Sequence, residues 1–500
     1  MKKAFCSRKI ISVFILILLL SCGSSRRFLG TGLCHAKHGL TIEEEKKLGE
    51  EFKNQLEKRL ELIKDPAVQK YIDTIGQNIL SQLEYKPFNF NFYVYVSSDP
   101  NAFAIPAGYI YISTGLITLT ENESELAGVI SHEIAHVTAR HIAEKIEQGT
   151  KLSMGALAAI LAGIFLGSGE IAEAVGAFSL ATMETLALKY SRENEEEADR
   201  LGLRYLTKAG YDGSGIVNFL KKLKGNRLEA FQLPSYLSTH PDVNMRIVYV
   251  ELMLERFPKQ TEPQDRTDLF HRIQAKLIAH TWNSQNAVNH FRSTLKSNPG
   301  RLDLLYGLAL AHYKSGNYKE AIKEFNNALA INPNDSEILK ELGICHFSEG
   351  RPEDAIPILQ RSVAIDEKDA SALFHLGRAY QENGNFRKAI DVYEKVKKED
   401  KSHVEVYYNL GLAYGEIELL GKAYQNFGTF YKLQHKFETA LSHFEKALEY
   451  YTVNTKESVD IQREIEEIKK KKPEKKNGNP IMKKMRPGIA PLKRFDRSFF

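Results

Sequence analysis

The sequence predicts an α+β domain, mostly helical with a small antiparallel sheet, followed by an all-α solenoid of repeated helix pairs. The chain has 500 residues, which is more than one compact domain usually contains. Apolar residues in positions 41–258 follow both helical and strand-like periods, as an α+β domain requires. From position 268 to 452 a pattern of small and aromatic residues recurs every 34 residues, which predicts the helical solenoid.

Positions 1–21 have the order of a secretory signal peptide. Four basic residues within the first nine precede an apolar run over positions 10–20, which is too short to span a bilayer comfortably. The run ends in "LLSC", which resembles a bacterial lipobox, so we expect cleavage before Cys22 and a lipid on that residue. An ordinary cleaved signal without a lipid is the alternative. The residue after Cys22 is Gly23 and not the aspartate that commonly signals retention in the inner membrane. We therefore expect a periplasmic protein that is anchored to the outer membrane.

Positions 465–500 form a basic tail that we expect to be disordered. Between positions 469 and 497 the chain has twelve Lys or Arg residues against Glu474 and Asp496, a net charge of +10. The whole chain has a formal charge of +5, so the remainder is net negative. A basic surface for nucleic acid is therefore not predicted.

The 34-residue pattern resembles the tetratricopeptide repeat. Gly316, Gly350 and Gly384 mark turns between paired helices, and an alanine recurs in register at positions 287, 321, 355, 389 and 423. This resemblance implies stacked helix pairs whose curved surface binds peptides or proteins. Ala440 and Phe444 come half a period early, which predicts either one shared helix or an extra capping helix.

Within positions 41–258, strands are predicted upstream of a long helix. Positions 88–98 and 107–114 alternate aromatic and β-branched residues, with Pro and Gly between them, and predict two strands of the antiparallel sheet. Thr120 and Glu123 form a Thr-x-x-Glu capping box, which predicts the start of the helix. An apolar run over positions 152–166 has the length of a buried or membrane-surface helix.

The stretch "SHEIAHVTARH" lies inside that helix. His132 and His136 are four residues apart and share one helical face, and Glu133 is beside the first of them. H-E-x-x-H is a zinc-site pattern in which the glutamate acts as a general base. The alternative is a structural helix with surface histidines. His141 is about 140° round the helix from His136, so we expect it on the surface and not as a ligand.

A zinc site needs a third protein ligand. The metzincin pattern would place Gly at position 139 and His at position 142, but the chain has Ala139 and Ile142. The remaining option is a glutamate from a later helix. Positions 191–200, "SRENEEEADR", offer several.

HEIAH, followed some sixty residues later by "YSRENEEEADRLGL", resembles the gluzincin metallopeptidases related to the HtpX heat-shock protease and the CAAX prenyl protease. The resemblance implies a zincin-type metalloprotease domain with one Zn²⁺ per chain, held by His132, His136 and Glu195. It also implies that Asp199 is the downstream acid, and a carboxylate there can orient a zinc-binding imidazole. The other acids are expected to form a solvated face: Glu193, Glu196 and Glu197.

A second segment, "STHPDVNMR" at positions 238–246, resembles a His-Pro loop near the metal in that family. His240 is then either a zinc ligand in a latent state or a donor to the developing oxyanion. Arg246 either neutralises developing negative charge or pairs with the acidic helix. The upstream segment "NAFAIPAGYIYISTGL" also resembles the family, whose strand edge near the zinc can take up substrate as an added strand.

The combination of this domain with tetratricopeptide repeats resembles periplasmic proteases of the β-barrel assembly-enhancing (BepA) type. It implies a secreted zinc metalloendopeptidase that degrades misfolded or stalled proteins in envelope quality control and outer-membrane protein assembly. Expected partners are unfolded or misassembled proteins, the assembly machinery through the repeats, and a membrane through the lipid anchor. In the reaction, Glu133 would take a proton from water and return it to the leaving amine. The alternative is a periplasmic chaperone or assembly factor that binds clients through its repeats and has a latent zinc site.

Overall fold

The computed structural model describes residues 40–148, 190–229, 235–257 and 265–471. The predicted signal peptide, Cys22, the apolar run at 152–166 and positions 472–500 of the predicted tail lie outside these residues. Within the described parts of the chain, no helix combines the length and apolarity needed to cross a bilayer.

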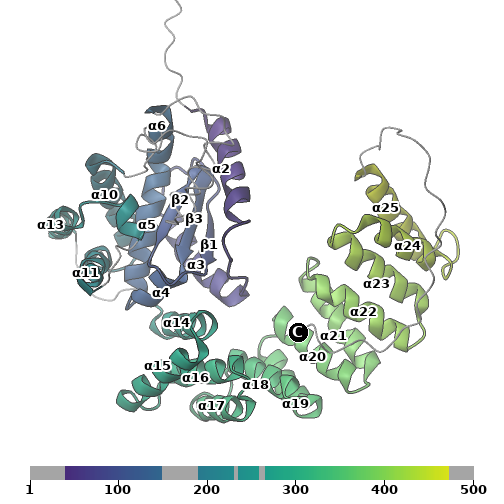
Figure 1. The fold of residues 1–500 in the computed structure, drawn as a ribbon. Coiled ribbons are helices and arrows are strands. Elements are labelled where there is room, and N and C mark those ends of the chain that lie inside the picture. Colours follow the sequence, from purple (N-terminus) through teal and green to yellow (C-terminus); the bar gives the residue numbers. More distant parts are fainter. Residues whose placement is uncertain (1–39, 149–189, 230–234, 258–264, 472–500) are drawn as a thin grey trace, which may run out of the picture.

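The first domain packs helices on both sides of a small sheet (Figure 1). Its helices are α2 (Ile42–Leu56), α3 (Pro66–Leu80), α4 (Thr114–Leu119), α5 (Glu123–Thr138), α6 (His141–Gln148), α10 (Arg192–Lys208), α11 (Ser214–Glu229), α12 (Ser235–Thr239) and α13 (Val243–Leu254). Helix α5 is central, because it contacts the sheet on one side and α10 and α11 on the other. All its residues from 123 to 137 are buried, as expected of a helix enclosed by its domain.

The sheet is small, as predicted, but it is mixed and not antiparallel. Strands β1 (Asn91–Tyr95) and β3 (Tyr109–Ser113) pair in parallel, and β2 (Ala102–Ile105) pairs antiparallel with β3 at the other edge. Strand β2 was not predicted; it lies between β1 and β3 in the sequence and runs antiparallel to β3. Strand β2 has only four residues and alternates alanine with a larger apolar residue, so it lacks the run of alternating aromatic and β-branched residues that identified its neighbours.

The start of α5 also differs from the prediction. Thr120 ends α4, and the cap of α5 is Asn122, whose side-chain oxygen accepts a hydrogen bond of 2.9 Å from the Glu125 backbone N–H. Glu123 is buried and accepts a hydrogen bond of 2.7 Å from the Tyr71 hydroxyl. The predicted capping box is therefore wrong, because a short helix occupies the residues before α5 and Glu123 is used for tertiary packing.

The second domain is a curved stack of helices (Figure 1). It comprises α14 (Thr267–Thr281), α15 (Ser284–Ser297), α16 (Leu302–Lys314), α17 (Tyr318–Ile331), α18 (Ser336–Ser348), α19 (Pro352–Ile365), α20 (Ala370–Glu382), α21 (Phe386–Glu399), α22 (Val404–Glu416), α23 (Leu420–Leu433), α24 (Phe437–Leu448) and α25 (Lys456–Lys471). Within a pair, a glycine receives the ring of the next helix. A methyl group at Gly377 would come within 2.4 Å of Tyr393.

The half-period shift at the end of the stack arises from a shared helix. Phe427 of α23 packs at Gly411 of α22, where a methyl group would come within 2.6 Å of its ring. Phe444 of α24 packs in the same way at Gly428 of α23, at 2.5 Å. Helix α23 is therefore the second member of one pair and the first member of the next, and α25 packs beyond α24.

Positions 465–471 belong to this stack and not to the tail. Ile461, Ile465 and Ile468 of α25 are buried in one cluster with Phe444 and Ala447 of α24. Their spacing of four and three residues is that of one helical face. The lysines that follow obscured this face in the sequence, so the predicted tail boundary at 465 was too early.

Helix α14 joins the two domains through polar contacts. The Gln274 amide donates hydrogen bonds of 2.9 and 2.6 Å to the carbonyls of Ile117 and Thr120 at the end of α4. Lys276 Nζ lies 2.7 Å from a carboxylate oxygen of Asp65, the residue that caps α3. Two segments far apart in the sequence are thus held together by a buried lysine and a helix cap.

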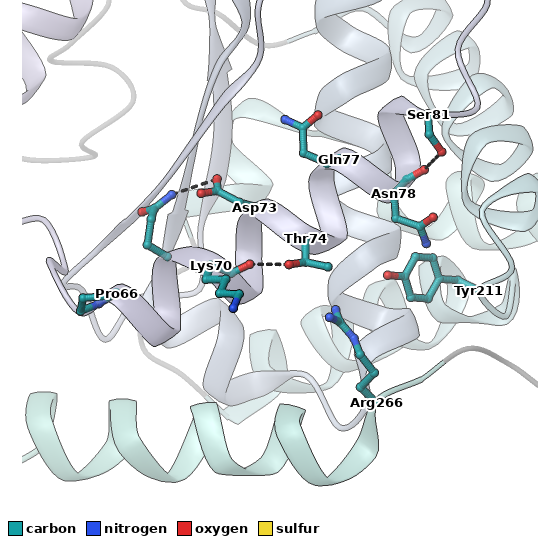
Figure 2. Close-up of a pocket in the computed structure, with 10 residues that line it drawn as sticks. Pro66, Lys70, Asp73, Thr74, Gln77, Asn78, Ser81, Tyr211 and Arg266 are labelled. Atoms are coloured by element: carbon teal, nitrogen blue, oxygen red, sulfur yellow. Dashed lines mark hydrogen bonds between the residues drawn. The ribbon is translucent and has the colours of Figure 1, made fainter. Parts of the chain in front are cut away.

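A hollow of about 1020 Å³ lies beside this junction, on the outer side of α3 (Figure 2). Most of the residues that line it have polar side chains, among them Asp73, Thr74, Asn78, Tyr211 and Arg266. None of the histidines or glutamates predicted to hold zinc lines it.

Candidate metal centre

Helix α5 carries His132, Glu133 and His136, and all three side chains are at most 1% exposed. Helix α10 packs closely against it at Gly202. A methyl group there would come within 3.1 Å of the His132 backbone, so a larger residue would force the helices apart. This close approach brings Glu195, in the first turn of α10, to the face that carries the histidines.

Four side chains converge on one point: His132, His136, Glu195 and His240. The Nε2 atoms of His132 and His136 are 3.0 Å apart, and His132 Nε2 is 3.3 Å from His240 Nδ1. Glu195 Oε1 lies 3.5 Å from His136 Nε2 and 3.0 Å from His240 Nδ1. Ligand atoms at ~2 Å from a tetrahedral zinc ion are about 3.3 Å from one another. The group is therefore compatible with a single zinc ion.

Unpaired polar atoms also point to a bound ligand. Both carboxylate oxygens of Glu133 and Nε2 of His240 are buried without a hydrogen bond to the described residues, and the nearest approach between them is 3.5 Å, from His240 Nε2 to Glu133 Oε1. Leaving a buried polar atom unpaired costs about 1–3 kcal/mol, so such atoms rarely cluster without a ligand. The arrangement fits residues that hold a metal ion and a reacting group.

Arg246 of α13 sets the charge of the two acids on α10. Its Nε and Nη2 donate hydrogen bonds of 2.8 and 2.7 Å to the two oxygens of Asp199, and its Nη1 lies 2.6 Å from Glu195 Oε2. Burial by itself would raise the pKa of both acids, but the Arg246 charge outweighs it and holds the pKa of each below its usual range. Of the two predicted alternatives for Arg246, the geometry matches the ion pair with the acidic helix.

Burial has opposite effects on the pKa values of Glu133 and His136. Burial raises the pKa of Glu133 to about 7, which suits a group that takes up a proton near neutral pH. Burial also lowers the pKa of His136, which favours the neutral imidazole that binds metal ions. The two glutamates therefore differ in protonation: Glu195 stays ionised, whereas Glu133 can gain or lose a proton near neutral pH.

Asp199 contacts the ring of His132. Its Oδ1 is 2.8 Å from His132 Nδ1, on the side of the ring that faces away from the metal group. The Tyr249 hydroxyl also donates a hydrogen bond to Asp199. The carboxylate therefore holds the His132 ring in orientation.

His141 is buried, so its predicted surface position is wrong. The side chain is 1% exposed, and its Nδ1 is 2.9 Å from His136 Nδ1. Helix α5 ends at Thr138, and Arg140 has a left-handed backbone with φ of 58°. The chain therefore turns before His141, and the helical angle that was extrapolated from His136 no longer applies.

Two tyrosines that the sequence analysis did not single out cover the site. The Tyr190 ring stacks on His136 with 3.7 Å between centroids, and the Tyr236 ring stacks on His240 at 4.3 Å. The Tyr190 backbone N–H donates a hydrogen bond of 3.1 Å to the Thr239 carbonyl. Tyr190 begins the segment "YSRENEEEADRLGL", but the covering role of either tyrosine is recognisable only from the ring that it touches. Together with His240 they enclose the metal group.

Comparisons with known proteins match both parts of the chain. The sequence model "Peptidase family M48" matches residues 66–253, and two tetratricopeptide-repeat models match residues 300–368 and 346–411. A putative beta-barrel assembly-enhancing protease of Vibrio cholerae is 31% identical over 244 residues, which are 48% of this chain and 50% of the relative. A beta-barrel assembly-enhancing protease of Yersinia pestis is 33% identical over 42% of this chain and 43% of the relative.

The matched segments thus span half or less of the length of these two relatives. Among solved structures, the crystal structure of MamA is similar to 33% of this chain and 92% of its own, with 26% identity and a TM-score of 0.29.

Proposed function

Because the chain contains a peptidase family M48 domain followed by tetratricopeptide repeats, we propose that it is a zinc-dependent metalloendopeptidase. One observation supports this function above the others. Glu133 is buried with no hydrogen bond to either carboxylate oxygen, and it lies next to four buried side chains that fit one zinc ion. A structural zinc site has no need of such a carboxylate, whereas peptide hydrolysis needs a base.

Each residue then has a role in hydrolysis. His132, His136 and Glu195 hold the ion, and Asp199 orients His132. A bound zinc ion supplies Lewis acidity, which activates water and polarises a peptide carbonyl. Glu133 takes the proton from the water and delivers it to the leaving amine nitrogen. Its pKa of about 7 allows both transfers near neutral pH.

His240 lies in the position that water or substrate would take in an active site, so the structure corresponds to a latent form of the enzyme. Its Nδ1 lies 3.3 Å from His132 Nε2 and 3.0 Å from Glu195 Oε1, so it would be the fourth ligand of a bound zinc ion. A catalytic zinc site keeps that position for water or substrate. We infer that His240, which directly follows α12, must move before a substrate reaches Glu133. Of the two predicted roles for His240, the latency ligand is the one that this geometry favours.

The closed site also supports the second candidate function, a chaperone or assembly factor with a latent metal centre. Glu133, His136 and His240 are fully buried, and a chain in this state could hold a client on its repeats without cleaving it. A client-protection assay with Glu133→Gln separates the two functions. Protection of an aggregating client by this variant supports the chaperone, and absence of protection argues against it.

The setting of the activity is also a proposal. We infer from the lipobox resemblance that the chain is exported to a bacterial periplasm and tethered to the outer membrane through Cys22. Its substrates would be misfolded or stalled envelope proteins, and its repeats would contact the outer-membrane assembly machinery. Incorporation of labelled palmitate by the parent, but not by Cys22→Ser, tests the anchor. Equal labelling of both would contradict it.

The test of the enzymatic function is degradation of casein by the mature chain, with bound zinc quantified. We expect cleavage by the parent, and we expect Glu133→Gln to retain zinc but lose hydrolysis, because the amide keeps the shape and cannot accept the proton. Glu196→Gln is the matched control, since Glu196 is an exposed acid on α10. Cleavage by Glu133→Gln at the parent rate would contradict the assignment.

A further inference from the structure

His141 takes no part in the proposed hydrolysis, yet it touches a metal-site imidazole. It is the first residue of α6, and its ring is buried beside His136, with Nδ1 atoms 2.9 Å apart. Its other nitrogen, Nε2, lies 3.3 Å from Glu197 Oε2 on the outer side of α10. His136, His141 and Glu197 therefore form a continuous polar chain from the metal group to an exposed carboxylate.

The protons on the hydrogen-bonded residues His136, His141 and Glu197 have one consistent arrangement. His136 points Nε2 at the metal group, 3.0 Å from His132 Nε2, so as a neutral ligand it carries its proton on Nδ1. That N–H faces His141 Nδ1, which must therefore act as the acceptor. The His141 proton is then on Nε2, where it can be donated to Glu197.

We propose that His141 is a positioning residue of the metal site, which accepts a hydrogen bond from His136 and so fixes the tautomer and orientation of that ligand. Glu197 in turn fixes the tautomer of His141. The opposite imidazole has an equivalent partner, because Asp199 Oδ1 lies 2.8 Å from His132 Nδ1. Both helix α5 ligands are thus backed by an acceptor, one directly by a carboxylate and the other through a second imidazole. This role rests on the proposed zinc function.

Zinc affinity of the full chain, measured by competition with a chelator, tests the role without relying on activity. Loss of a hydrogen-bond partner behind a metal ligand lowers affinity by about 10- to 100-fold, and this loss is expected for His141→Leu. His141→Asn places an amide oxygen near the position of Nδ1, and its affinity should return close to that of the parent. Rescue by Asn distinguishes an acceptor from a residue that only fills space.

A second pair of variants avoids any change in the core. Glu197 is exposed, so Glu197→Ala should fold, and it should weaken zinc binding because it releases the His141 tautomer. Glu196→Ala, the adjacent exposed acid, should leave zinc binding unchanged. Nitrogen chemical shifts of isotope-labelled histidine in the zinc-loaded chain should show a proton on Nδ1 of His136 in the parent and in His141→Asn.

The outcomes separate this role from the proposed function. Parent-like zinc affinity of both His141→Leu and Glu197→Ala would overturn the positioning role and leave the zinc function standing. Equal weakening by His141→Leu and His141→Asn would also overturn it, because a hydrogen-bond acceptor would then not matter. A parent chain without zinc affinity would overturn the zinc function and, with it, the positioning role.

Discussion

Replacement of Arg246 by alanine should strongly destabilise the contact between α10 and α13. Arg246 is the cation for two buried carboxylates, with three contacts of 2.6 to 2.8 Å to Glu195 and Asp199. Removal of one partner of a buried ion pair costs about 3–5 kcal/mol. His132 and Tyr249 would still contact Asp199, so the lower end, about 3 kcal/mol, is expected.

Hydrogen exchange resolved along the sequence is the suitable assay. A chain of two domains need not unfold in one step, whereas amide protection reports the stability of each helix. Because a factor of ten corresponds to about 1.4 kcal/mol, a loss of 3 kcal/mol lowers protection in α10 by about 100-fold. Arg246→Lys keeps the charge but not the two-point contact with Asp199, and it should fall between the parent and Arg246→Ala.

The chain offers a matched control. Arg192 and Asp242 also join α10 to the start of α13, with 2.6 Å between their charged atoms, but the Arg192 side chain is 78% exposed. Exposed pairs contribute at most about 1 kcal/mol, so Arg192→Ala should change protection by less than about fivefold. Two results would contradict this reasoning: a loss of protection in α10 of less than about tenfold in Arg246→Ala, or an equal loss in Arg192→Ala. Either would show that burial does not increase the contribution of the Arg246 ion pairs to the stability of α10.

Three further outcomes are expected. Burial raises the pKa of Glu341 in α18 to about 7, so the folded chain holds a proton that the unfolded chain releases above about pH 4.5, and stability should fall as pH rises through this window. Glu341→Gln should remove that part of the slope in urea midpoints measured at pH 5 and pH 8, and an unchanged slope would contradict it. Gly202→Val should weaken zinc binding, since its side chain would meet the His132 backbone; zinc titration with a parent-like result would show that α10 can shift. His240→Ala should cleave casein faster than the parent and retain zinc, whereas a rate equal to that of the parent would argue against latency.

Local pattern was sufficient wherever a function lies within one element. The spacing of His132, Glu133 and His136 is set by the helical repeat, and the structure places all three on one buried helix. The 34-residue period predicted the helical stack in the same way. Both predictions depend on a periodicity that is written in consecutive residues.

The same reasoning failed where the chain leaves that periodicity. Strand β2 has only four residues and none of the alternating aromatic and β-branched pattern of its neighbours, so it was overlooked, and the parallel pairing of β1 with β3 was overlooked with it. His141 was placed on the surface because the helix was extended past Thr138, although Arg140 turns the chain there. A turn at one residue changes the direction of every residue after it, and no period reports it.

The sequence by itself determined which residue types can bind a metal ion and take up a proton, and, through a family resemblance, that Glu195 and Asp199 belong with the histidines of α5. Only the tertiary structure decided how these groups are protonated, paired and covered. Arg246 keeps both acids ionised, and Tyr190 and His240 close the site. These properties arise from burial and from contacts between segments more than 40 residues apart in the sequence, which depend on how helices pack and not on the order of residues within any one of them.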